Sequence, residues 1–204
     1  MKNAQYFFGS ALVRYEVPEH MLETLNHLAD QLLLKGIPEK LRIREQLASA
    51  VNSEVEIPLL LVREFSEFVF GIAGDYHRSY AAHDRGEPEF QVDRMWVVSQ
   101  REGEWNYLHS HLGDLSGVLY LRVPENMAAG LPENDKRSLS PGAISFTEGV
   151  PGPYRKSIKT FHPKVGDLYL FPSELTHTVY PFFGPEERRS LSFNLRVISQ
   201  KTSR

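Results

Sequence analysis

HSHLGDLSGVLYL, residues 109–121, joins two histidines one residue apart to a strand-like run of apolar residues. A second stretch further along the chain, FPSELTHTVYPFFGPEERRSLSFN at residues 171–194, supplies a third histidine, His177. Side chains at positions i and i+2 of an extended chain point to the same side. His109 and His111 can therefore approach one point, and an antiparallel neighbour can bring His177 to the same point. Such a split of three histidines on a β-scaffold is typical of a metal site.

The composition describes an ordinary soluble protein. The 204 residues are 41% hydrophobic and 24% charged, which suits one domain with a single core. The net charge of −3 argues against a general binder of nucleic acid or anionic membranes. Cysteine is absent, so disulfides are excluded and any metal must be held by His, Asp or Glu. The sequence shows neither a signal-peptide core nor a run of 18 apolar residues, so we expect a cytoplasmic protein.

The N-terminal part has mainly helical periodicity. Residues 4–17 are expected to form a strand, and apolar residues then recur at a 3.6-residue period over residues 21–33. A shorter helix is expected at residues 38–50, and a second long one over residues 58–80. We interpret residues 1–90 as a helical support for a sheet.

The remainder of the chain has β character. Short strands separated by Gly and Pro turns are predicted at 95–100, 115–123, 143–147, 166–171, 176–180 and 188–198. They favour a sandwich or jelly roll over residues 91–204, with 1–204 as one domain. A long segment rich in Pro, Gly and charge, at about 124–163, is expected to be a loop insertion. With Arg155, Lys156 and Lys159 it is either a lid that recognises a substrate or a solvated loop.

The last predicted strand alternates between apolar and polar residues. Its polar set is Arg188, Ser190, Ser192, Asn194 and Arg196. The apolar set needs the core that the helices supply, so the polar set would face the inside of the sandwich, where it needs partners. Arg188 beside Ser190 suits a carboxylate, because a guanidinium offers a planar, bidentate fork. The alternative is that Arg188 is a solvated strand end. Arg189 points with the apolar set and is expected to be a surface charge.

The order H-x-H, then H, then R-x-S resembles the iron(II)/2-oxoglutarate-dependent dioxygenases, whose fold is the double-stranded β-helix. The segments HSHLGDLSGVLYL, FPSELTHTVYP and RRSLSFN are similar to those of a bacterial and phage branch of that superfamily. The resemblance covers residues 94–198. It implies a mainly β, cupin-like jelly roll with N-terminal α-helices packed on one sheet. It also implies Fe(II) as cofactor and 2-oxoglutarate and O₂ as co-substrates.

By this resemblance His109, His111 and His177 are the metal ligands and the catalytic residues. His111 stands where most of the superfamily has Asp or Glu, and Asp114 or water could replace it as a ligand. Arg188 and Ser190 would hold the distal carboxylate of 2-oxoglutarate. Further candidate contacts to the co-substrate are Tyr120 and Asn194, while Tyr107 or Tyr169 could take the place of Tyr120.

The implied activity is hydroxylation of an unidentified substrate, with release of succinate and CO₂. Two alternatives stay open: a cupin-like metal enzyme that does not use 2-oxoglutarate, and a non-catalytic ligand-binding jelly roll. Cupins usually add a Glu a few residues after the H-x-H pair, and Asp114 is too near to fill that place. No nucleic acid or membrane is expected as a partner, and a homodimer is compatible with the sequence.

Overall fold

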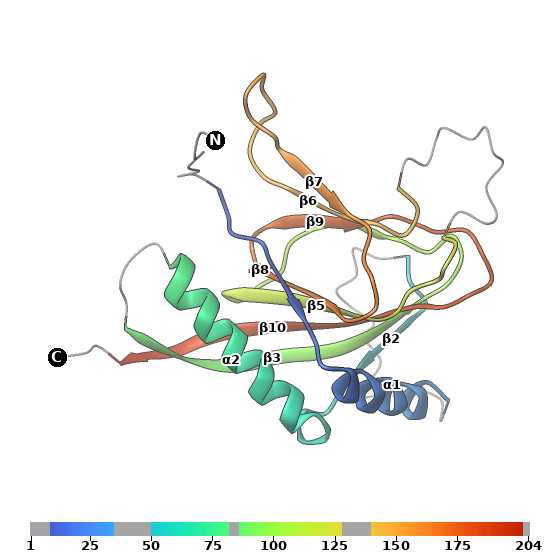
Figure 1. Ribbon diagram of the computed structural model, residues 1–204, viewed down its shortest axis with the longest axis horizontal. Helices are drawn as coiled ribbons and strands as arrows, with labels where there is room; N and C mark the ends of the chain where they lie inside the picture. The colour runs from blue at the N-terminus through green and yellow to red at the C-terminus, as the bar shows by residue number, and fades with distance from the viewer. Residues whose placement is uncertain (1–8, 35–49, 82–85, 128–139, 202–204) are drawn as a thin grey trace.

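The computed structural model describes residues 9–34, 50–81, 86–127 and 140–201. In chain order the elements are β1 (Val13–Glu16), α1 (Glu19–Leu34), β2 (Ser53–Glu56), a short 3-10 helix (Leu59–Leu61), α2 (Arg63–Tyr80), β3 (Glu87–Gln100), β4 (Asn106–His109), β5 (Leu115–Arg122), β6 (Ile144–Thr147), β7 (Ile158–Phe161), β8 (Asp167–Pro172), β9 (Thr176–Val179) and β10 (Arg188–Lys201). The strands form two antiparallel sheets, of order β1-β8-β5-β10-β3-β2 and β4-β9-β6-β7 (Figure 1). The predicted mainly β jelly roll is confirmed.

Both described helices cover the outer face of the six-stranded sheet (Figure 1). Leu191, Phe193 and Leu195 of β10 are fully buried there, against Leu25 of α1 and Phe65 of α2. This contact explains why every second residue of β10 is apolar. No helix in the described part of the chain is long and apolar enough to cross a membrane.

A second apolar cluster lies between the two sheets. It joins Val118 and Tyr120 of β5 to Tyr169 and Phe171 of β8 and Phe146 of β6. Strands β5 and β8 therefore have core on both faces, which accounts for the unbroken apolar runs in their sequences. Val118, Tyr120 and Phe171 of this cluster also line the pocket that holds the candidate site.

Several details differ from the sequence-based expectations. Strand β2, which was not predicted, pairs with β3, while β1 lies within the strand predicted over residues 4–17 and pairs with β8. The segment at about 124–163 contains the predicted strand β6 and also β7, which was not predicted and forms a hairpin with β6. Strand β7 is four residues long and lies at a sheet edge, so its apolar alternation is too short to stand out in the sequence. The helix predicted at 38–50 lies outside the described residues except for residue 50, as do residues 4–8 of the first predicted strand.

The expectation that Arg189 is a surface charge is wrong. Its side chain does point toward the helices, as predicted, but the residue is only 2% exposed. The guanidinium donates to both carboxylate oxygens of Glu187 at 2.8 Å and lies 2.8 Å from Oδ1 of Asp30 on α1. Helix α1 thus covers this charge with acceptors, which the alternation within β10 could not reveal.

Candidate metal centre and co-substrate pocket

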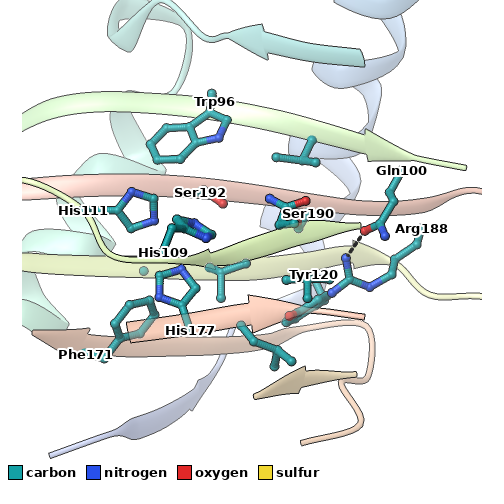
Figure 2. Close-up of a pocket in the computed structure, with 16 residues that line it drawn as sticks. Trp96, Gln100, His109, His111, Tyr120, Phe171, His177, Arg188, Ser190 and Ser192 are labelled. Atoms are coloured by element: carbon teal, nitrogen blue, oxygen red, sulfur yellow. Dashed lines mark hydrogen bonds between the residues drawn. The ribbon is translucent and has the colours of Figure 1, made fainter. Parts of the chain in front are cut away.

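The three histidines of the sequence pattern converge at one end of a pocket between the sheets (Figure 2). Strand β4 pairs with β9, which places His109 directly opposite His177. His111 follows β4 by two residues, and one ring nitrogen from each histidine lies within 4.8 Å of the other two. The ring centroids are 4.9 Å apart for the 109–111 pair, 4.3 Å for 109–177 and 5.1 Å for 111–177. This spacing lets three imidazoles bind one ion from one side.

Backbone carbonyls fix the tautomers of two of these rings. Nδ1 of His109 lies 2.6 Å from the carbonyl oxygen of Tyr107, and Nδ1 of His177 lies 3.0 Å from that of Leu175. A carbonyl oxygen can only accept, so each Nδ1 carries the proton and donates. Each Nε2 therefore keeps its lone pair for a metal, as is usual for histidine ligands.

The surroundings keep all three histidines uncharged. Burial, followed by the nearby His109 ring, lowers the pKa of His177 to about 3. Burial and His109 likewise lower the pKa of His111 to about 4, and burial also lowers the pKa of His109. At neutral pH the cluster thus presents three neutral nitrogen donors, which suit a divalent transition metal and need lose no proton to bind it.

The turn that carries His111 is tied to the neighbouring strands. The backbone N–H of His111 donates to the carbonyl of Ser173 at 2.8 Å. Gly113 has φ +113°, and a Cβ there would lie 2.8 Å from the carbonyl oxygen of Leu195, so only glycine fits. The carboxylate of Asp114 accepts from the N–H of Val197 at 2.8 Å. Asp114 therefore anchors the turn to β10 and lies outside the histidine cluster. The sequence alone had left Asp114 open as a possible metal ligand.

Arg188 lies at the opposite end of the same pocket and is only 2% exposed (Figure 2). Its Nη1 donates to Oε1 of Gln100 at 2.7 Å, while its Nε and Nη2 have no hydrogen-bond partner among the described residues. The guanidinium carbon lies 4.7 Å from the centre of the Tyr120 ring, and the Tyr120 hydroxyl is also buried without a partner. Burial raises the pKa of Tyr120, so its hydroxyl is a neutral donor at physiological pH. A buried cation whose N–H donors have no acceptor destabilises the fold, unless the carboxylate of a bound ligand accepts their hydrogen bonds.

Other predicted contacts divide into those inside the pocket and those outside it. Ser190 and Tyr120 line the pocket. Asn194 does not, because its Oδ1 accepts from the hydroxyl of Ser116 at 2.8 Å. Tyr169 donates to Asp167 at 3.3 Å, which leaves Tyr120 as the tyrosine beside Arg188.

Two further alternatives point to the surface. Tyr107 is 45% exposed and packs on Trp105, with ring centroids 4.2 Å apart. Arg196, the other arginine of the polar set of β10, pairs with Asp93 at 2.9 Å, and its side chain is more than half exposed.

Sequence reasoning missed Trp96 and Gln100, which both line the pocket. The Trp96 ring meets the His111 ring edge-on, with centroids 5.7 Å apart. Together with Val98 these residues occupy alternate positions of β3, so they share one face. That alternation was the available signal, but it could not be assigned to the pocket before the pairing of β3 with β10 was known.

The jelly roll places a three-histidine cluster and a buried arginine in one pocket, an arrangement that suits a non-haem metal enzyme. Residues 94–194, which include the H-x-H pair, His177 and Arg188, match the model of the family described as "Putative 2OG-Fe(II) oxygenase". Over this region the chain matches the 2OG-Fe(II) oxygenases, and the match implies Fe(II) as cofactor and 2-oxoglutarate and O₂ as co-substrates. No curated protein matches the sequence.

Solved structures of low sequence identity share the fold. A prolyl-4-hydroxylase from Pseudomonas putida is 14% identical with a TM-score of 0.63, over 93% of this chain and 94% of that one. A viral collagen prolyl hydroxylase from Paramecium Bursaria Chlorella virus-1, in complex with 2OG, is 13% identical with a TM-score of 0.58, over 92% and 96%. HygX from Streptomyces hygroscopicus, with nickel and 2-oxoglutarate bound, is 10% identical with a TM-score of 0.56, over 96% and 86%.

Proposed function

We propose that this oxygenase hydroxylates its prime substrate while converting 2-oxoglutarate to succinate and CO₂. The observation that carries the proposal is the buried guanidinium of Arg188, whose Nε and Nη2 have no partner among the described residues. It shares its pocket with three neutral imidazoles. A dicarboxylate that reaches from the histidine cluster to Arg188 would satisfy both ends of the pocket at once.

Each pocket residue then has a distinct role. His109, His111 and His177 would hold Fe(II) through one ring nitrogen each. Arg188 would bind the far carboxylate of 2-oxoglutarate, with the hydroxyls of Tyr120 and Ser190 as further donors. When bound, iron(II) would supply the oxygen chemistry, by which one atom of O₂ would be incorporated into succinate and the other would convert a C–H of the substrate to C–OH. The protein contributes position and exclusion of water.

The charge of the pocket favours linked binding of metal and co-substrate. Apart from Arg188, the described residues that line the pocket are uncharged when the histidines are neutral. An iron(II) ion on three imidazoles keeps its full double charge, which the dianion of 2-oxoglutarate balances. Because binding free energies are reciprocal, each ligand should strengthen the binding of the other.

An anaerobic titration tests the proposal. Adding 2-oxoglutarate to the Fe(II) protein should produce a weak visible charge-transfer band, because the keto acid chelates the metal. His177→Ala should abolish the band, whereas the exposed His162→Ala serves as a matched control and should keep it. Succinate formation should depend on iron and on His177. Metal binding without a band at saturating 2-oxoglutarate would contradict the proposal and favour a metal enzyme that does not use the keto acid.

A further inference from the structure

A second pocket lies next to the histidine cluster. We call it the edge groove. Its apolar lining residues are Leu12, Phe146, Ile158, Phe161 and Leu175. Two of them adjoin His177: the rings of Phe146 and His177 have centroids 5.7 Å apart, and the carbonyl of Leu175 accepts from Nδ1 of His177. Phe146, which lines the edge groove, is therefore a direct neighbour of His177, which lines the metal pocket.

Residues from the edges of both sheets border the edge groove. Strand β7 is the last strand of the four-stranded sheet, and within the described residues it pairs only with β6. Ser10 and Leu12, on the other side, lead into β1, which is the last strand of the six-stranded sheet and pairs only with β8 in the described chain. An unpaired strand edge offers a row of backbone donors and acceptors to an extended chain.

The edge groove is basic, although the whole chain carries a net charge of −3. Lys156 and Lys159 line it, and Arg155 adjoins them on the exposed β6–β7 connection. The acidic lining residue Glu148 offsets only one of the two lysine charges, and its carboxylate accepts from the backbone N–H and the hydroxyl of Ser10 at 2.8 and 2.7 Å.

Backbone hydrogen bonds close the β6–β7 connection that carries Arg155 and Lys156, and Lys159 follows in β7. Gly152 and Arg155 exchange two backbone hydrogen bonds of 3.2 Å, and Glu148 N–H donates to the carbonyl of Ser157 at 2.9 Å. The cations are therefore presented from a defined position above the apolar floor.

We propose that the edge groove binds an extended, acidic polypeptide segment, and that this segment belongs to the prime substrate. The second statement rests on the proposed function. A polypeptide fits better than a nucleic acid, because nucleic-acid grooves use exposed aromatic rings for base stacking. The aromatic residues that line the edge groove are Phe146, which is buried, and Phe161, which is half-buried with the ammonium of Lys159 5.2 Å above its ring; the exposed Tyr154 lies on the β6–β7 connection outside this lining.

A display library of random dodecapeptides, selected on the full-length protein, tests the inference. We expect the enriched sequences to be acidic with interspersed apolar residues. The best peptide, measured by fluorescence anisotropy, should bind at least about tenfold more weakly to Lys156→Glu/Lys159→Glu than to the wild type. The matched control Arg101→Glu/Lys164→Glu reverses two exposed charges outside the edge groove and should bind as the wild type does. Methylation of backbone nitrogens in the peptide should weaken binding at alternate positions.

Three outcomes would overturn the inference: enrichment of neutral or basic sequences, equal binding by the groove variant, or displacement of the peptide by a single-stranded oligonucleotide that binds more tightly. Peptide binding should survive His177→Ala, because the edge groove does not need the metal. Peptide binding without a keto-acid band would thus contradict the proposed function alone. A keto-acid band without selective peptide binding would contradict the edge groove alone.

Discussion

Arg188 is the residue at which stability and function oppose each other. Burial lowers the pKa of its guanidinium, and its Nε and Nη2 have no partner in the described structure. Replacing an incompletely paired buried charge by an apolar side chain is often neutral or stabilising. We predict that Arg188→Met raises the dissociation constant for 2-oxoglutarate by roughly 30-fold or more, which is about 2 kcal/mol. The melting temperature of the ligand-free protein should stay the same or rise.

Calorimetric titration of 2-oxoglutarate into the Fe(II) protein without oxygen, with thermal melts alongside, would measure both effects. Arg188→Lys keeps a positive charge but loses the planar fork, so its affinity should be intermediate. Arg196→Met removes a surface arginine of the same strand and should leave the affinity unchanged. An unchanged affinity in Arg188→Met would show that the far carboxylate binds elsewhere.

At the scale of elements, the turn between β4 and β5 decides where His111 lies. A Cβ on Gly113 would meet the Leu195 carbonyl at 2.8 Å, and the φ of +113° is strained for any other residue. We predict that Gly113→Ala lowers the free energy of unfolding by about 1–3 kcal/mol and weakens metal binding, because the turn must move away from β10. Chemical denaturation and metal titration would measure the two effects.

Gly149 provides the matched control for this turn. It also has a positive φ, +68°, but no described atom lies within 4 Å of the site of its Cβ. Gly149→Ala should therefore cost only the backbone strain, about 1 kcal/mol, and leave metal affinity intact. Metal affinity that falls equally in both variants would show that the effect is general and does not come from the turn.

At the scale of the whole molecule, a network of charges joins α1 to the six-stranded sheet. Glu187 lies at its centre, with Arg189, Arg122 and Ser99 as partners, and Asp30 of α1 binds both arginines. Burial alone would raise the pKa of Glu187, but the hydrogen bonds from Arg189 and Ser99 and the charges of both arginines outweigh it. The pKa is therefore below its ordinary value of 4.5.

This direction fixes how stability depends on pH. Because the pKa of Glu187 is lower in the folded than in the unfolded state, its contribution is fully present above pH 4.5. The contribution is lost as the pH falls from 4.5 through the folded-state pKa. We predict that Glu187→Gln is less stable than the wild type at neutral pH. In acid, the free energy of unfolding of Glu187→Gln should fall less steeply with pH than that of the wild type. The two slopes should differ by at most about 1.4 kcal/mol per pH unit, which is the effect of one proton.

Thermal melts of the wild type and the variant across the acid range would test this prediction. Glu67→Gln is the control, because Glu67 forms an exposed pair with Arg63, and such pairs contribute little. Its stability curve should run parallel to that of the wild type. Equal acid slopes in the wild type and Glu187→Gln would place the titrating group elsewhere.

The sequence by itself determined the local patterns. The i, i+2 spacing of His109 and His111 requires only an extended chain, and the alternation in β10 already placed Arg188 on the face opposite the core. Periodicity likewise predicted α1 and all of α2, because a helix stripe is a property of neighbouring residues. These features follow from distances of a few residues along the chain.

Only the tertiary structure decided which distant residues meet. The position of Tyr120 beside Arg188, the contact of Gln100 with Arg188, and the burial of Arg189 beneath Asp30 all depend on strand register and helix placement. Strand β7 and the edge groove beside it were equally hidden. The physical reason is that side chains far apart in sequence become neighbours only when the sheets pair, and pairing is set by the packing of the whole core.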